Sequence, residues 1–278
     1  MRRLCGVRNT IRDKVKIRSL TEVSVGWGKI ETGTDIPEST VTPSTDTIYV
    51  EDLYGLTKLG EDELMDTDAN LAAMVANSFA IALANAEEKA FVIGDGHTYS
   101  EPEGICTDAV YTADAGNGKG AGYDGTYGSN WSIDDTVALE DMLQCEYDLG
   151  TQYLNGAVWL MNRKTELAAR VLRAEVASGF YGNFLWQPSL MVGQPASFDG
   201  FPIYNNNNMA YPADTTAAVN VIFGNLKNAY LILDRSGMSL QRLDELYAEA
   251  GLVGFKVHKR VGGGMIRYAA LHLIHNDT

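Results

Sequence analysis

The residues with the clearest capacity for chemistry lie in one short stretch that combines two glycines with three carboxylates. Gly94 and Gly96 flank Asp95, and Glu101 and Glu103 follow. Glycine amides can bind phosphate, but nucleotide loops place their glycines after a strand and before a helix, whereas these follow a helical pattern. The carboxylates do not have the spacing of a calcium loop. The sequence therefore predicts a solvated turn that binds nothing. The residues predicted to form it are Gly94, Asp95, Gly96, Pro102 and Gly104.

Histidine, cysteine and serine side chains give no second candidate site. His272 and His275 are three residues apart, which is not the i, i+4 spacing of a zinc-binding pair on a helix. Cys106 has no partner cysteine at a useful spacing, and no Gly-x-Ser-x-Gly sequence is present to form a nucleophile elbow. We therefore predict that the protein is not an enzyme and that it has no catalytic residue, metal or cofactor.

The remaining charged residues of interest are predicted to have structural roles. Glu87 and Glu88 are adjacent in a helical segment, so their side chains diverge by about 100° and cannot flank one bond. Both are expected to be exposed. Arg235, which follows Asp234, and Arg260 are expected to form structural ion pairs.

The composition is that of a folded chain without export or membrane signals. The chain has 278 residues, of which 45% are hydrophobic, and its mean hydropathy is −0.13. No run approaches the roughly 18 uncharged apolar residues of a membrane span. Cys5, Cys106 and Cys145 have no paired spacing, so neither a disulfide framework nor a zinc site is indicated. A reducing cytosol fits these features best.

The charge is distributed unevenly between the start of the chain and the rest. Residues 1–18 contain seven Lys and Arg and one Asp, a net charge of +6, whereas the whole chain carries −14. The remainder therefore carries −20. A basic arm of this kind can contact nucleic acid or an acidic neighbouring subunit, and a frayed, solvated terminus is the alternative.

A long helix is predicted in the segment 67–93. Apolar residues recur at spacings of three and four and predict one apolar face, and the segment is rich in alanine. The residues of this face are Leu71, Val75, Phe79, Leu83, Ala86, Ala90 and Ile93. Asp66 or Thr67 can cap its start, and Gly94 or Gly96 can end it. A helix of this length spans roughly 39 Å.

An extended β-loop is predicted before this helix, in residues 22–56. Residues 19–46 are rich in Thr, Ser, Gly and Pro, and a projecting loop commonly has this composition. Ile48, Val50, Leu53 and Leu56 then follow in near-alternation, as in the returning arm of a hairpin.

The second half of the chain mixes helices and strands. Ser132 is expected to begin a helix that extends to about Tyr147, and Ala157–Met161 reads as a buried strand. Asn162 can cap a following helix whose inward residues are expected to be Leu167, Val171 and Leu172. The region Phe180–Pro212 is predicted to be rich in loops, with irregular secondary structure. Four short strands are expected between Val219 and His258. The last of them is expected to turn around Gly262–Gly264 and to pair with a strand that returns from Ile266 to Leu273. The fold class is therefore α+β.

Short motifs follow one another in a recognisable order along most of the chain. They are Leu59–Asp66, Glu87–Phe91 with Gly94–Gly96, Pro102–Ile105, Trp159–Asn162, Gly200–Ile203, Phe223–Asn225, Tyr230–Arg235, and Phe255–Arg260 with Gly263. In this order they resemble the major capsid proteins of tailed phages, which have the Hong Kong 97 fold. No single motif is specific, but the ordered set is.

The resemblance implies a particular domain layout. It predicts an N-terminal arm at 1–21, an extended loop at 22–56, a first part of a peripheral domain at 57–131 with the spine helix at 67–93, an axial domain at 132–243, and a return to the peripheral domain at 244–278. The residues expected to make contacts between subunits are Arg2, Arg3, Arg8, Arg12, Trp27, Ile36, Pro37, Glu61, Asp62, Arg235 and Arg260.

The resemblance also implies a function and a set of partners. Such a subunit would self-assemble into hexamers and pentamers of an icosahedral phage head, in the host cytoplasm, and would become part of the virion. Double-stranded DNA would be enclosed without sequence-specific binding. Scaffold, portal and decoration or cement proteins are the other expected partners, and no membrane is involved.

The sequence departs from the founding member of that fold at its covalent crosslink. That protein joins a loop Lys to an Asn of a neighbouring subunit, whereas residues 33–57 here contain no Lys and the Asn position falls near Gly251. We therefore expect non-covalent stabilisation. No long charged scaffold segment precedes the arm, so such a segment is expected to be removed or separate. The alternatives are an encapsulin-type compartment shell and an α+β enzyme acting through Asp95 and Glu103.

Overall fold

The computed structural model describes residues 1–20, 43–66, 71–107, 139–171, 173–176, 180–184, 197–210 and 219–275. Several sequence-based expectations lie outside these residues. They are the contact residues Trp27, Ile36 and Pro37, the helix start at Ser132, and the inward position of Leu172. No helix in the described ranges is long and apolar enough to cross a membrane.

The first sheet combines the beginning and the end of the chain. Its order is β1–β10–β11–β3–β2, with β1 parallel to β10 and the other neighbours antiparallel. The strands are β1 (Gly6–Asn9), β2 (Lys14–Leu20), β3 (Pro43–Gly60), β10 (Tyr230–Leu243) and β11 (Leu252–Met265). The late strands thus pair with earlier ones, as an α+β arrangement requires.

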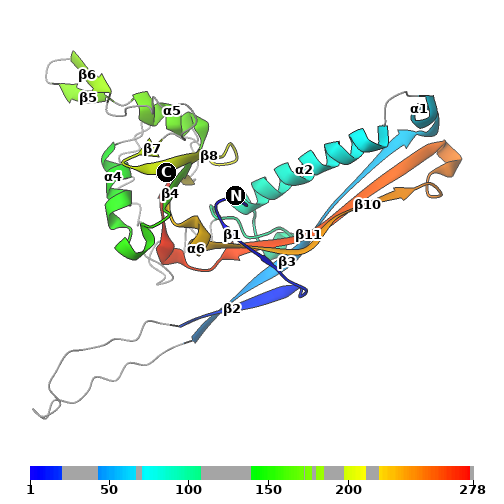
Figure 1. The fold of residues 1–278 in the computed structure, drawn as a ribbon, viewed down its shortest axis with the longest axis horizontal. Coiled ribbons are helices and arrows are strands. Elements are labelled where there is room, and N and C mark those ends of the chain that lie inside the picture. The colour runs from blue at the N-terminus through cyan, green and yellow to red at the C-terminus, as the bar shows by residue number, and fades with distance from the viewer. Residues whose placement is uncertain are drawn as a thin grey trace, which may run out of the picture.

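Strand β3 is 18 residues long and belongs to two pairings in succession. Residues 43–49 pair with β2, and residues 50–60 pair with β11. The β2–β3 pairing confirms the predicted returning arm of a hairpin at Ile48, whereas Val50, Leu53 and Leu56 pair with β11 instead. It also gives a two-stranded ribbon that extends beyond the ladder with β11 (Figure 1).

The prediction of a turn at Gly262–Gly264 was wrong. All three glycines lie inside β11, and β10 is likewise one strand rather than two short ones. A Cβ atom at Gly262 would lie 2.2 Å from the Tyr49 carbonyl oxygen, and one at Gly263 would lie 2.2 Å from the Tyr230 hydroxyl oxygen. These positions therefore require glycine because neighbouring groups approach closely, and not because the chain turns.

Helix α2 (Leu71–Ile93) lies along the first sheet, and the short helix α1 (Glu61–Asp66) precedes it (Figure 1). The predicted end at Ile93 is confirmed. Residues 67–70 lie outside the described ranges, so the predicted start is not tested. The predicted apolar face was partly wrong, because Ala86 and Ile93 are exposed. The buried side chains are Leu83, Glu87, Phe91 and Val92, all in the C-terminal half of the helix.

The second sheet has the order β12–β9–β4–β8–β7. Its strands are β4 (Val158–Met161), β7 (Ser197–Phe198), β8 (Phe201–Asn205), β9 (Val219–Gly224) and β12 (Leu271–His275). Helices α4 (Leu139–Asp148) and α5 (Arg163–Val171) lie beside it (Figure 1). A short helix α6 (Leu226–Ala229) leads into β10, and β5 (Arg173–Val176) pairs with β6 (Phe180–Phe184). Four one-turn 3-10 helices complete the described part: His97–Tyr99, Thr151–Tyr153, Ala248–Ala250 and Tyr268–Ala270.

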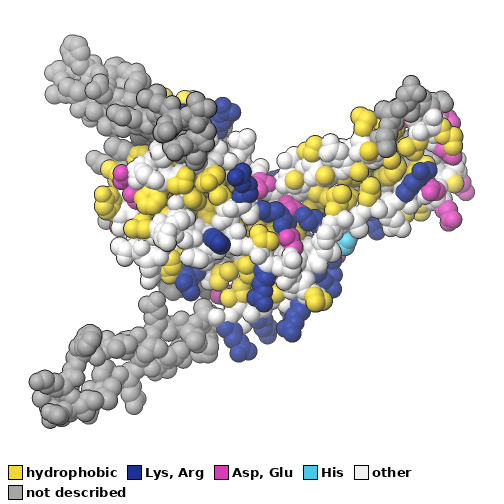
Figure 2. Space-filling model, in the orientation of Figure 1, with side chains coloured by type: hydrophobic (Ala, Val, Ile, Leu, Met, Phe, Trp, Pro, Cys, Tyr) yellow, Lys and Arg dark blue, Asp and Glu magenta, His cyan; other side chains and the backbone are white. Residues whose placement is uncertain are grey.

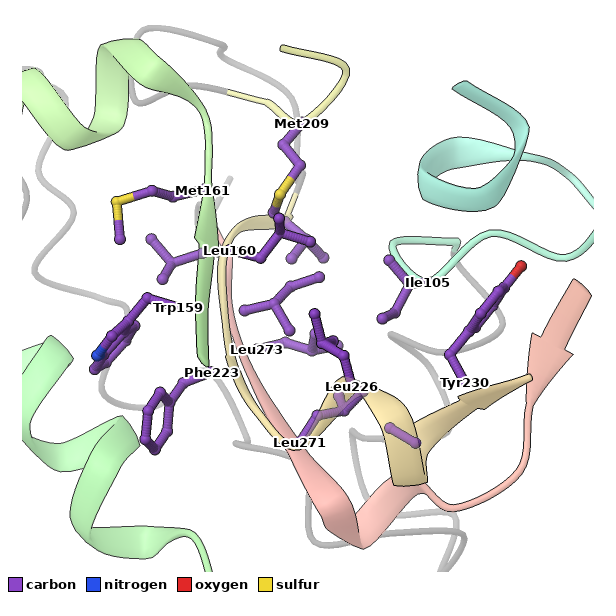
Figure 3. Packing of buried hydrophobic residues seen from close by; sticks show 14 of the residues in the cluster. Ile105, Trp159, Leu160, Met161, Met209, Phe223, Leu226, Tyr230, Leu271 and Leu273 are labelled. Atoms are coloured by element: carbon purple, nitrogen blue, oxygen red, sulfur yellow. The ribbon is translucent and has the colours of Figure 1, made fainter. Parts of the chain in front are cut away.

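The main core forms around β4, whose prediction as a buried strand is confirmed. In Figure 3, Trp159 and Met161 point to one side of this strand and Leu160 points to the other. Trp159 and Phe223 lie with their ring centroids 4.3 Å apart. Strand β4 is therefore apolar at successive positions because both of its faces are covered.

The region Phe180–Pro212 is less irregular than predicted, since it contains β6, β7 and β8. Helix α5 begins as predicted, with the Lys164 amide donating to Oδ1 of Asn162 at 3.0 Å. Its predicted inward face was wrong, because Leu167 is 63% exposed and Val171 is 55% exposed. The residues that the helix buries are Thr165, Glu166 and Ala169. Helix α4 likewise buries Met142 but leaves Tyr147 exposed.

Candidate functional site

The glycine-containing turn after α2 closes the helix onto the first sheet. The Gly104 amide donates to the Gly94 carbonyl at 2.9 Å, and the Ile105 amide donates to the Phe91 carbonyl at 3.0 Å. The Glu103 amide reaches the Gly263 carbonyl in β11 at 3.1 Å. The first two bonds satisfy carbonyls at the helix end that would otherwise lack partners, and the third joins the turn to β11. The arrangement is structural.

Each residue of the predicted turn has a definite place in this closure. Gly94 is buried, and a Cβ atom there would lie 2.2 Å from the Pro102 carbonyl oxygen. Asp95 forms an isolated antiparallel bridge with Glu103, and Gly96 has a positive φ of 81°. Among the described residues, no group of three or more His, Cys, Asp and Glu could hold a metal ion.

A group of four charged residues, which we call the ionic junction, joins the beginning of the chain to α2 and the first sheet. Its members are Arg2, Glu87, Asp234 and Lys259. Arg2 donates from Nε to Glu87 Oε2 at 2.9 Å, and from Nη1 and Nη2 to the two oxygens of Asp234 at 2.6 and 2.8 Å. Lys259 forms a second ion pair with Glu87. Bidentate hydrogen bonds between Arg and a carboxylate are among the stronger polar interactions in proteins.

The prediction that Glu87 and Glu88 are exposed was wrong for Glu87, whereas Glu88 is half-buried. Glu87 is only 5% exposed because it lies four residues from Leu83 and from Phe91, on the buried face of α2. That spacing was the signal in the sequence that could have identified it. Glu88 accepts hydrogen bonds from the amino group of Met1 at 2.7 Å and from Nδ2 of Asn206 at 2.7 Å. It therefore links α2 to the loop that follows β8 in the second sheet.

The Arg2–Asp234 contact predicts a pH dependence of stability. The hydrogen bond from Arg2 lowers the pKa of Asp234 below its usual value. Because the folded-state pKa lies below the unfolded one, the carboxylate stabilises the fold above about pH 4, and this contribution disappears as the pH falls through the lowered pKa. Asp234→Asn should therefore lower the free energy of unfolding by a constant amount between about pH 5 and pH 8. In urea unfolding, the difference from the wild-type protein should shrink below about pH 4.

Arg235 and Arg260 form the ion pairs that the sequence predicted. Asp13 pairs with Arg235 and accepts from Arg260 Nη2 at 2.8 Å. Arg260 also donates from Nε to Asp52 at 2.5 Å. These contacts attach the β1–β2 turn to β3, β10 and β11. The charge of both arginines is therefore balanced within the subunit.

The remaining described contact candidates lie on the surface. Arg3, Arg8 and Arg12 are exposed, and Arg3 also lines a cavity of about 530 Å³ beside the ionic junction. Glu61 and Asp62 are exposed at the start of α1. Figure 2 shows Lys and Arg side chains gathered in the region that contains β1, β2 and the turn between them, and Asp and Glu side chains gathered at the end that contains α1.

A carboxyl pair connects α4 to the turn between β7 and β8. Burial, and secondarily the nearby carboxylate of Asp199, raises the pKa of Glu146 to about 7. Because the folded-state pKa lies above the unfolded one, the fold gains stability from the protonated form below about pH 4 and loses it as the pH rises through about 7. Glu146→Gln should therefore raise the melting temperature at pH 8 and leave it nearly unchanged at pH 4. Asp148→Asn, on the exposed side of the same helix, is the matched control.

The comparisons with known proteins define the class to which this fold belongs. A family model described as "Phage capsid family" matches residues 1–276. The chain therefore belongs to the phage capsid family, and its role is structural rather than enzymatic. A search of curated proteins finds no match.

Solved structures resemble the chain over its full length. One is described as "Capsid of native GTA particle computed with C5 symmetry"; it is 26% identical, with a TM-score of 0.79, and the match covers 100% of this chain and 89% of that chain. Mycobacterium phage Adephagia has a similar structure, with a TM-score of 0.68 and 16% identity, over 99% of this chain and 89% of that chain. The structure of Mycobacterium phage Bobi has a TM-score of 0.66 and 14% identity, over 99% of this chain and 89% of that chain. At these lower identities the similarity concerns the fold.

Proposed function

We propose that this capsid protein has the Hong Kong 97 fold and that it self-assembles into the hexamers and pentamers of an icosahedral phage head around double-stranded DNA. The observation that carries the proposal is the match of the entire chain, rather than one domain, to a solved capsid at 26% identity. Self-association is the expected role of a subunit that aligns from end to end with a shell protein.

The arrangement of elements supports the expected domain layout. Helix α2 and the first sheet fit a peripheral domain with its spine helix, and the second sheet with α4 and α5 fits an axial domain. The β2–β3 ribbon fits the base of an extended loop, and β1 fits an arm. The boundaries at residues 21, 56, 131 and 243 are part of this proposal.

The partners follow from the same role. We expect scaffold, portal and decoration proteins to bind the assembled shell, assembly to take place in the host cytoplasm, and DNA to be enclosed without sequence-specific contacts. The contact residues of the sequence analysis remain the proposed contact residues between subunits. Among them, Arg2, Arg235 and Arg260 also have partners within their own chain.

Electron microscopy of the purified protein tests this function. Closed shells built from six-fold and five-fold capsomers are expected, and particles isolated from producing cells should contain nuclease-protected double-stranded DNA. A protein that stays monomeric at high concentration under all assembly conditions would contradict the proposal. Particles that contain a co-purified enzyme and no DNA, identified by mass spectrometry, would instead indicate a compartment shell.

A further inference from the structure

One end of the first sheet carries a concentration of negative charge, which we call the acidic end. It forms where β3 ends, α1 begins and β10 turns into β11, and the Glu61 amide holds these segments together by donating to the Gly251 carbonyl at 3.0 Å. Met65 and Leu246 are large apolar side chains exposed at this end. The exposed carboxylates are those of Glu61, Asp62, Glu63, Asp244, Glu245 and Glu249.

Few positive charges balance the acidic end. Arg242 pairs with Asp244 at 2.6 Å, and Lys58 lies over the ring of Tyr247 at 4.1 Å from its centroid. Six exposed carboxylates thus lie near three cations in this described region, since Lys256 is exposed opposite Gln241 in β10. The end keeps a net negative charge around an exposed apolar centre.

A second surface, which we call the basic edge, has the opposite character. It consists of β1 and β2, which are the two outer strands of the first sheet, and of the turn at residues 10–13 that joins them. Asp13 also lies in this turn, but its carboxylate forms ion pairs with Arg235 and Arg260. Ile11, which is 91% exposed, lies among the cations. The exposed cations are Arg8, Arg12, Lys14, Lys16 and Arg18.

The two surfaces cannot neutralise each other within one subunit. The basic edge pairs with residues 43–49 at the start of β3, and the acidic end lies beyond Gly60 at the end of the same strand. A strand rises about 3.3 Å per residue, so the surfaces are separated by roughly 40 Å. That distance is several times the screening length of about 8 Å at physiological ionic strength.

We propose that the acidic end of one copy docks on the basic edge of a second copy. Each surface has an apolar centre and a charged rim, the usual organisation of a protein–protein interface, and the rims have opposite charge. Because the two surfaces differ, the contact is head-to-tail and propagates from copy to copy until it closes into a ring or a lattice. The inference rests on the proposed function and adds to it the pair of surfaces that meet.

Charge reversal gives a test with an internal rescue. Lys16→Glu with Arg18→Glu gives β2 a net negative charge, and Glu61→Lys with Asp62→Lys gives the first turn of α1 a net positive charge. The assembled fraction of each variant alone, measured by sedimentation, should fall by at least about tenfold, because like charges then meet. An equimolar mixture of the two variants should assemble, because the altered edge of one variant and the altered end of the other have opposite charge, as do the two unaltered surfaces. A chain with all four substitutions should also assemble alone.

The controls distinguish loss of this contact from misfolding and from a general effect of changed net charge. Lys89→Glu with Arg163→Glu changes the net charge equally at exposed positions outside both surfaces, and should assemble like the wild-type protein. Monomer melting temperatures should be equal in all variants. Normal assembly of the single-surface variants, or failure of the mixture beside an assembling wild-type protein, would overturn the contact. Particles of the edge variant that assemble normally but contain less DNA would indicate that the basic edge contacts nucleic acid instead. A wild-type protein that does not assemble would contradict the proposed function as well.

Discussion

Gly262→Ala is expected to lower the free energy of unfolding by about 3 kcal/mol, at the upper end of the usual cost of overpacking. The new Cβ atom would lie 2.2 Å from the Tyr49 carbonyl oxygen and 3.2 Å from the Cα atom of Val50. Both contacts are with the backbone of β3, which its partners on either side hold in place. Strand β3 would therefore have to move away from β11, and ladder hydrogen bonds would be lost.

Gly237→Ala in the neighbouring strand β10 is the matched control for this substitution. A Cβ atom at that position meets nothing within 4 Å, so the change in unfolding free energy should stay within about 0.5 kcal/mol. Urea unfolding followed by circular dichroism measures both variants. Equal destabilisation of the two would contradict the conclusion that close approach, and not strand propensity, requires glycine at Gly262.

Glu87→Ala is expected to be about as damaging, at roughly 3 kcal/mol. The substitution leaves Arg2 and Lys259 facing each other without the carboxylate that both contact. Removing one partner of a buried ion pair costs more than the pair contributes, because the remaining charge stays desolvated. Partial exposure of Arg2, at 34%, places the expected effect at the lower end of the range for buried pairs.

A double-mutant cycle with Arg2→Ala isolates the interaction itself. The coupling free energy between the two positions should exceed about 1 kcal/mol, as is usual for residues in one network. Glu101→Ala, an exposed carboxylate in the turn after α2, should have little effect. Strictly additive effects of the Arg2 and Glu87 substitutions would show that the ionic junction does not act as a unit.

The sequence predicted best the features that depend on local patterns. The end of α2 at Ile93, the buried strand around Trp159 and the cap at Asn162 each follow from a few adjacent residues. The ion pairs of Arg235 and Arg260 were also anticipated, although their shared partner Asp13 was not.

The errors arose where distant neighbours decide the role of a residue. A run of glycines looks the same whether the chain turns or a second strand passes close by, and only the position of Tyr49 distinguishes these cases at Gly262. Helical periodicity also does not say which face meets the core. Leu167 and Val171 are apolar yet exposed in this subunit, whereas the charged Glu87 is buried because Arg2 and Lys259 come from remote parts of the chain.

The continuity of β3 has a mechanical consequence. The strand leaves its pairing with β2 and enters the ladder with β11 without a break. Tension along the ribbon would therefore act parallel to β3, and perpendicular to the hydrogen bonds that join residues 50–60 to β11. In this shear geometry the bonds share the load and must break together, whereas a sideways pull would peel them apart one at a time. A force applied to the ribbon by a neighbouring subunit would thus be transmitted into the sheet beneath α2.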